Sequence, residues 1–242
     1  MILASSAMGI ASDSYVKMFT VAIQFGAILS VVLLYYKRFL NLTDLRFYLH
    51  LFIAFLPAVF FGLLLKDWID ALLENPMVVA ISLLLGGMVL VGIDRWFRQT
   101  ATGSGTQTSP LKALVIGCFQ VLAMVPGVSR SAATIIGGMS QGLNRTQAAE
   151  FSFFLAVPTM LGATVKSMWD LWQTEPELFH AENLKLLALG NLVAFLVALV
   201  AIRGFINFLT KRGFALFGWY RIVLGGVILA LYAAGFQLEM VG

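Results

Sequence analysis

Residues 124–138, MVPGVSRSAATIIGG, combine a helix break with hydroxyls and a basic group in an otherwise apolar stretch. The planar guanidinium of Arg130 suits phosphate or carboxylate oxygens. A helix that starts after the break would add free N–H groups and a positive dipole end, which together favour an anion. The pattern predicts that a phosphate group is held inside the membrane. The residues concerned are Pro126, Gly127, Ser129, Arg130, Ser131 and Thr134.

A plainer interpretation is open for the same segment. Ser and Thr side chains can bond back to carbonyls that the break sets free, and Arg130 can extend its charge to the membrane surface. Pro126 and Gly127 are structural on either interpretation. Gln120, which lies before the break, either packs the segment through a hydrogen bond or contacts a substrate.

The composition sets the class of protein that must position these groups. The chain has 242 residues, of which 60% are hydrophobic and 12% charged. A soluble domain is about half apolar and a quarter charged, so we expect an all-α polytopic membrane protein forming a single membrane domain, 1–242. The net charge of +4 comes from residues at the ends of apolar segments, which argues against a nucleic-acid partner. The single cysteine, Cys118, excludes an internal disulfide.

Six apolar segments are long enough to span, since about 20 residues are needed for each crossing. They are predicted at 19–36, 47–65, 77–97, 147–170, 183–203 and 219–238. Residues 111–142 do not fit this pattern, because two shorter apolar runs flank the break. They form either one kinked span or a re-entrant hairpin of two half-helices.

The distribution of Lys and Arg separates these alternatives. If 111–142 enters and returns, 11 of the 16 basic residues fall on one side and 4 on the other, with Arg130 inside the membrane. A full crossing gives 8 against 7. Cytoplasmic loops carry the excess of Lys and Arg, so we predict a re-entrant hairpin that enters from the cytoplasm. Arg221, at the start of the last span, is interpreted as a topology anchor on that side.

Three spans precede the hairpin and three come after it, which predicts an inverted-topology repeat. The first repeat would be 1–110 and the second 111–242. LGGMVLVGI at 85–93 resembles LGGVILALY at 224–232. The second half has a hairpin before its spans, so a true repeat calls for a partner hairpin ahead of Met1. In addition, Asn144 followed by Gln147 predicts a capping box at the start of the fourth span.

The chain resembles the bacterial undecaprenyl-diphosphate phosphatases of the bacitracin-resistance type. The resemblance is carried by PGVSRSAAT followed by EFSFFLAVP, and it extends to IQFGAILSVV near the start and WYRIVLG near the end. It implies a hydrolase of the bacterial plasma membrane that removes one phosphate from undecaprenyl diphosphate and so recycles a lipid carrier for cell-wall synthesis. The partners it implies are an isoprenoid lipid diphosphate and membrane lipid, and it leaves a homodimer open.

The resemblance also implies roles for the motif residues. Arg130 and Ser129 would be catalytic, with Arg130 gripping the diphosphate while Ser129 and Thr134 bond its oxygens. From their positions at and before the break, Gly127, Ser131 and Gln120 are added to the predicted substrate site, with the packing role of Gln120 left open. The family depends on a divalent cation, Mg²⁺ or Ca²⁺. The sequence departs from the family at the family's first motif, a paired-glutamate stretch followed by Pro-Val-Ser-Ser-Thr-Gly-His. MIL at 1–3 resembles the residues immediately after that His, so we expect the glutamates, the candidate Ser nucleophile, the His and the carboxylate ligands of the cation to be absent from this sequence.

Two rival functions are compatible with the same sequence. Inverted repeats with broken helices are also typical of transporters, so a transporter or lipid flippase is the first rival. Net movement of lipid or ion without phosphate release would favour it. The second is a non-catalytic remnant, which would persist in the membrane without turnover.

We expect the 242-residue chain alone to be inactive or severely impaired, because attack on phosphorus needs a nucleophile or activated water as well as charge stabilisation. Phosphate release from an isoprenyl diphosphate in detergent with magnesium should appear only when a family-like hairpin is added upstream. Arg130-dependent turnover by the 242-residue chain alone would contradict this expectation.

Overall fold

The computed structural model describes residues 10, 13–65, 68–69, 72, 75–97 and 108–234, and every regular element within them is helical. Six helical segments are long and apolar enough to cross a membrane. They are Ser14–Leu34, Leu45–Leu64, Met77–Trp96, Arg145–Thr174, Ala181–Arg212 and Ala215–Ala233. All six predicted spans are therefore confirmed, and the protein is an all-α polytopic membrane protein.

The described residues fall into two compact units, and each is described by itself. The first comprises residues up to Asp44 together with Phe154–Phe205. Its elements are α2 (Ser14–Ala22), α3 (Gln24–Leu34), α4 (Tyr36–Phe39), η1 (Pro176–Phe179) and most of α11 (Arg145–Thr174) and α12 (Ala181–Arg212). The predicted division into repeats at residue 110 stays a prediction.

The first predicted span is interrupted within the first unit. α2 and α3 meet at Ile23, where the helical pattern breaks. The N–H group of Gly26 donates a hydrogen bond of 2.8 Å to Oδ1 of Asn191, and Nδ2 of Asn191 donates to the carbonyl of Leu187 at 2.9 Å. An amide from α12 thus satisfies a backbone donor that the break exposes, as an apolar setting requires.

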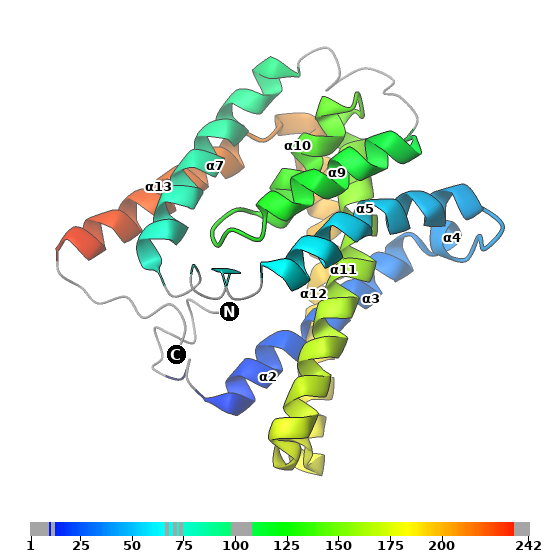
Figure 1. Ribbon diagram of the computed structural model, residues 1–242, viewed down its shortest axis with the longest axis vertical. Helices are drawn as coiled ribbons and strands as arrows, with labels where there is room; N and C mark the ends of the chain where they lie inside the picture. The colour runs from blue at the N-terminus through cyan, green and yellow to red at the C-terminus, as the bar shows by residue number, and fades with distance from the viewer. Residues whose placement is uncertain are drawn as a thin grey trace. The chain divides into compact units, whose positions relative to one another are not determined.

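The second unit contains Leu45–Phe153 and the residues from Ile206 onward. Its main elements are α5 (Leu45–Leu64), α7 (Pro76–Trp96), α9 (Pro110–Leu122), α10 (Arg130–Ser140) and α13 (Ala215–Ala233). α7 and α13 pack extensively against each other, and Figure 1 shows them next to each other.

Small residues bring α7 and α13 together. A Cβ added to Gly87 would lie 2.7 Å from the carbonyl oxygen of Gly218, and one added to Gly225 would lie 2.8 Å from that of Ala80. Position numbers rise on one helix as they fall on the other, so the pair is antiparallel. Close backbone approach through small residues is how helices pack within membranes. The LGG triplets that predicted the repeat therefore each place a glycine in this interface.

The segment 111–142 doubles back on itself as two short helices, α9 and α10. They pack side by side, and Gly137 of α10 lies against the Cβ atom of Phe119 in α9. At 1.5 Å per residue they are about 20 Å and about 16 Å long, well short of a bilayer core of about 30 Å. The chain is thus a helical hairpin here, and the kinked-span alternative is excluded.

The hairpin is attached to its neighbours at both arms. Gly117 of α9 lies directly against the backbone of Ala54 in α5, with no space for a side chain. After α10, the predicted capping box opens α11: the N–H group of Gln147 donates to Oδ1 of Asn144 at 2.8 Å, and that of Asn144 donates to Oε1 of Gln147 at 3.1 Å. This prediction is confirmed.

Gly87→Ala should destabilise the second unit, because the added Cβ meets the backbone carbonyl of Gly218, which cannot rotate away. Overpacking of this kind costs about 1–3 kcal/mol. Thermal unfolding in detergent measures the loss. Gly204→Ala on α12 is the control, since a Cβ there meets nothing within 4 Å. Equal stability of the two variants would contradict the packing described.

Candidate anion-binding site at the hairpin tip

The tip of the hairpin is a tight turn between Leu122 and Arg130 in which Gly127 is indispensable. Gly127 has φ +87°, a conformation that side-chain-bearing residues rarely adopt. A Cβ there would also lie 2.5 Å from the carbonyl oxygen of Val79 and 3.0 Å from the Cβ of Ser82, both in α7. Both the backbone turn and the close approach of α7 therefore require glycine, which confirms its structural role.

Ser129 is the N-cap of α10. Its backbone is extended, and its Oγ accepts a hydrogen bond of 3.3 Å from the N–H group of Ala132. The Oγ atoms of Ser129 and Ser131 are 3.2 Å apart. The structure thus brings these two predicted site residues together at the helix start, on either side of Arg130 in the sequence.

Arg130 is the first residue of α10 and is partly buried. A charged side chain at membrane depth costs about 2.5–3.5 kcal/mol on insertion scales, which makes it a functional candidate by default. Beside it are two serine hydroxyls and the N-terminal end of a helix of 11 residues. Guanidinium, hydroxyl groups and a positive helix end are the groups that bind phosphate oxygens.

Thr134 is placed differently from the other predicted residues. Its side chain is 1% exposed, and its Oγ1 lies 2.7 Å from Oγ of Ser152 in α11 and 3.0 Å from the carbonyl oxygen of Arg130. The hydroxyl is thus used within the protein, tying α10 to α11. Its predicted contact with substrate stays a prediction. Ser152 was not predicted, because nothing in the sequence pairs it with Thr134.

Gln120 lies on α9 and is 3% exposed. This burial fits the interpretation that it packs the hairpin. Its alternative role, contact with a substrate, stays a prediction as well.

Arg221, which the sequence indicates as a topology anchor, makes a contact that the sequence does not predict. It lies within α13, and its Nη2 donates a hydrogen bond to the carbonyl of Gly127. The guanidinium is therefore directed at the hairpin tip, whereas a topology anchor extends to the surface. An arginine inside an apolar helix is the sequence signal for such a contact. Because Arg221 lies near the end of the predicted span, the same residue also fits a topology anchor.

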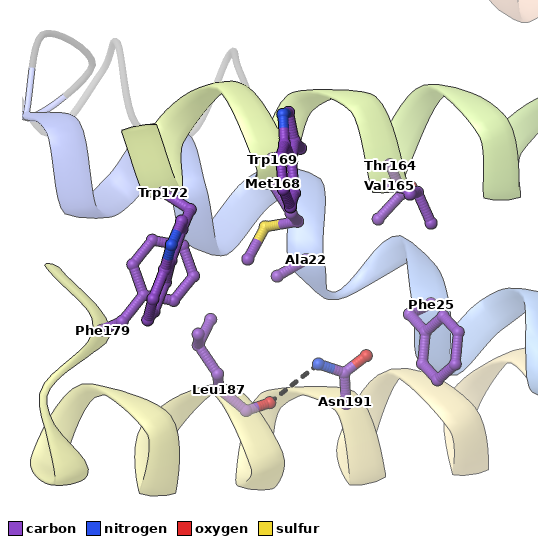
Figure 2. A pocket seen from close by; sticks show the side chains of 10 residues that line it. All are labelled: Ala22, Phe25, Thr164, Val165, Met168, Trp169, Trp172, Phe179, Leu187 and Asn191. Atoms are coloured by element: carbon purple, nitrogen blue, oxygen red, sulfur yellow. Dashed lines mark hydrogen bonds between the residues drawn. The ribbon is translucent and has the colours of Figure 1, made fainter. Parts of the chain in front are cut away.

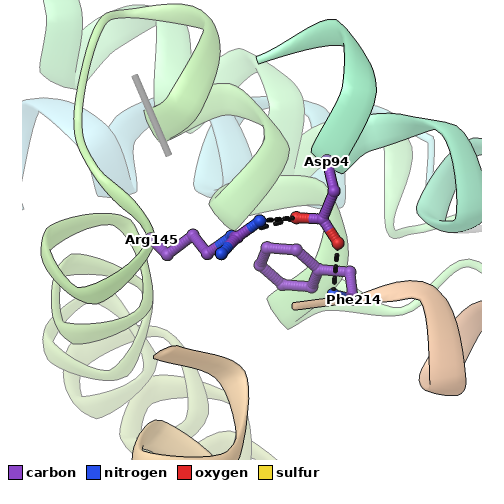
Figure 3. Close-up of polar contacts among 3 residues, drawn as sticks. All are labelled: Asp94, Arg145 and Phe214. Atoms are coloured by element: carbon purple, nitrogen blue, oxygen red, sulfur yellow. Dashed lines mark hydrogen bonds and ion pairs between the residues drawn. The ribbon is translucent and has the colours of Figure 1, made fainter. Parts of the chain in front are cut away.

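A second polar cluster lies at the ends of α7, α11 and α13, within the second unit (Figure 3). The carboxylate of Asp94 accepts hydrogen bonds from Nε of Arg145 at 3.0 Å and from the N–H group of Phe214 at 2.7 Å. Arg145 Nη2 also lies 2.8 Å from Asp94, and both side chains are largely buried. Gly213, with φ +71°, leaves the space that the carboxylate fills. All groups of this cluster have partners, so it is structural.

The first unit contains an open pocket of ≈ 510 Å³ (Figure 2). Trp169 and Trp172 of α11, Phe179 and the helix α12 surround it. Its lining holds no ionisable group, and its polar side chains are Thr164 and Asn191. A pocket of this kind suits a hydrocarbon chain and offers nothing to hold a phosphate.

The divalent cation implied by the resemblance needs oxygen ligands, chiefly carboxylates. Within the described residues no group of three or more His, Cys, Asp or Glu side chains could hold a metal ion. The residues that are described therefore do not fit such an ion, and no chemical step is assigned to it. The requirement for a divalent cation stays a prediction.

The fold and the hairpin tip define a class: a polytopic α-helical membrane protein in which a helical hairpin carries an arginine and two serine hydroxyls at its tip. Comparisons with known proteins identify a single family. The family model described as bacitracin resistance protein BacA matches residues 1–227. An undecaprenyl-diphosphatase of Flavobacterium johnsoniae is 57% identical over 233 residues, covering 96% of this chain and 87% of the relative.

Two other relatives carry the same name. The undecaprenyl-diphosphatase of Bdellovibrio bacteriovorus is 49% identical over 243 residues, covering 100% of this chain and 90% of its own. That of Porphyromonas gingivalis is 46% identical over 257 residues, covering 99% and 91%. This chain belongs to the bacitracin resistance protein BacA family, as the motif predicted. It is a multi-pass protein of the bacterial plasma membrane.

Thr134→Val should destabilise the protein by about 1–3 kcal/mol, because it leaves the buried Ser152 hydroxyl without its partner. Thr134→Val combined with Ser152→Ala should cost less than the sum of the two single variants. Thermal unfolding in detergent of the wild type, the two single variants and the double variant gives the coupling free energy between the two hydroxyls. Additive losses would show that the two hydroxyls do not act as a pair.

Proposed function

We propose that this protein hydrolyses the diphosphate of an isoprenoid lipid, undecaprenyl diphosphate, to the lipid monophosphate and inorganic phosphate. Membership of the family and the names of its relatives support this substrate. The observation that carries the proposal is the start of α10, where Ser129, Arg130 and Ser131 meet at the tip of a membrane-embedded hairpin. The monophosphate would return to cell-wall precursor synthesis.

The reaction adds water across the phosphoric anhydride. Oxygen from water bonds to the terminal phosphorus, the bond from that phosphorus to the bridging oxygen breaks, and the bridging oxygen stays with the lipid monophosphate. Negative charge spreads over the equatorial and leaving oxygens in the transition state, so catalysis depends on positioning and on charge stabilisation.

Arg130 is the group best suited to that stabilisation. Its fork can donate two parallel hydrogen bonds to phosphoryl oxygens, and its charge offsets theirs. Ser129 and Ser131 offer hydroxyls beside it, 3.2 Å apart. The N-terminal end of α10 adds a partial positive charge in the same direction. These groups bind and stabilise the phosphate that is transferred.

The lipid tail needs a different surface. The six membrane-spanning helices present large apolar side chains on their outer faces, among them Trp169, Leu189 and Val200. Hydrocarbon can therefore stay in apolar surroundings while the headgroup reaches polar ones.

Arg130→Ala should lower phosphate release from undecaprenyl diphosphate by about 100- to 1,000-fold, the usual effect of removing one charge-stabilising donor. The assay uses purified protein in detergent with magnesium, both as the 242-residue chain and with an upstream hairpin added. Arg203→Ala is the matched control, since Arg203 is an exposed arginine on α12. It should leave the rate unchanged.

Two results would contradict the proposal. Absence of phosphate release from both forms of a folded protein would exclude hydrolysis. Movement of lipid or ion across proteoliposome membranes without phosphate release would assign the hairpin to transport.

A further inference from the structure

We propose that Arg221 is a positioning residue for the hairpin tip: through the carbonyl of Gly127 it fixes the turn from which Ser129 and Arg130 start α10. The kinetic part of this inference rests on the proposed phosphatase function. The structural part, that Arg221 holds the turn, does not.

The first observation is the hydrogen bond itself. Nη2 of Arg221 donates to the carbonyl of Gly127, across 94 positions of sequence. A bond from a charged donor is stronger than one between neutral groups. The acceptor belongs to a residue at φ +87°, where the chain changes direction. The bond therefore acts on the peptide group that sets the exit angle of the turn.

The second observation is the orientation of the guanidinium. An arginine that anchors topology extends its charge to the membrane surface. Arg221 is instead turned inward, and its Nε is buried with no hydrogen-bond partner among the described residues. Burying a donor in this way is unfavourable, so the side chain occupies this position because of the carbonyl that Nη2 binds.

The third observation is the space made for the guanidinium by α7. A Cβ added to Gly86 would lie 2.9 Å from Nη2 and 3.4 Å from Cζ of Arg221. The neighbouring residue, Gly87, faces Gly218 instead and holds α7 against α13. The two adjacent glycines thus have separate roles: one keeps the helices close and the other leaves room for the side chain that crosses to the tip.

These contacts connect to the predicted chemistry through a short piece of chain. Gly127 is separated from the N-cap Ser129 by Val128 alone. A shift of the Gly127 peptide moves Ser129 and the first turn of α10 with it. Misplacement of catalytic groups by about 1 Å can cost about 100-fold in rate. Arg221 can therefore govern catalysis without touching the substrate.

The test uses two different ways of breaking the same bond. Arg221→Met removes the donor, whereas Gly86→Ala displaces it by placing a Cβ in its path. In the form with the upstream hairpin added, each should lower kcat by about 10- to 100-fold with little change in KM. The double variant should be no slower than Arg221→Met, because both changes act on one bond. Gly226→Ala on α13, where a Cβ meets nothing within 4 Å, should match the wild type.

Arg221→Lys provides a rescue. A lysine ammonium can donate one hydrogen bond to a carbonyl, so it should recover part of the rate that Arg221→Met loses. Wild-type turnover by Gly86→Ala, or additive losses in the double variant, would overturn the proposal. A rise in KM with unchanged kcat in Arg221→Met would also overturn it, because that is the signature of substrate binding.

A second readout does not depend on catalysis. The native Cys118 is replaced by Ser, Val128→Cys is introduced at the tip, and the rate of thiol labelling is measured in detergent. Arg221→Met and Gly86→Ala should speed labelling relative to Gly226→Ala, because the turn is less restrained. Unchanged labelling would overturn the proposal. Faster labelling in a protein that releases no phosphate even with the upstream hairpin added would support the positioning role and contradict the phosphatase function.

Discussion

A polar turn placed among apolar helices must have its backbone groups satisfied by the protein itself, and the rest of the second unit is organised around that constraint. The hydrocarbon of the bilayer offers no hydrogen bonds to the exposed ends of α9 and α10. Ser129 caps the start of α10, and Arg221 binds the carbonyl of Gly127. Gly127 and Ser129, where these contacts are made, lie within three residues of Arg130, the residue proposed to bind phosphate.

The helices that carry these contacts are themselves tied together at one end. Asp94, near the end of α7, binds Arg145 at the start of α11 and the N–H group of Phe214 at the start of α13. A carboxylate at the N-terminal ends of two helices is also favoured by their dipoles. α7 and α13 then hold a fixed relation along the glycine interface, which sets where Arg221 can reach.

The sequence predicts features whose signal is local. Hydropathy predicts the six spans, the PGVSRS break together with the distribution of Lys and Arg predicts the hairpin, and Asn144 with Gln147 predicts the capping box. Features that depend on distant residues are not predictable in this way. Arg221 meets Gly127 across 94 positions, and Arg145 meets Asp94 across 51. The burial of Thr134 against Ser152 likewise results from the packing of α10 on α11.

A re-entrant hairpin enters and leaves the membrane on one side and carries Arg130 inward at its tip. The most direct measurement is sided thiol labelling in sealed vesicles, with the native Cys118 replaced by Ser. Single cysteines are placed at Leu111, at the start of α9, and at Ser140, at the end of α10; both positions are exposed. For a hairpin that enters from the cytoplasm, an impermeant reagent should reach both cysteines from the cytoplasmic face. Labelling from opposite faces would contradict it and make the segment a full crossing.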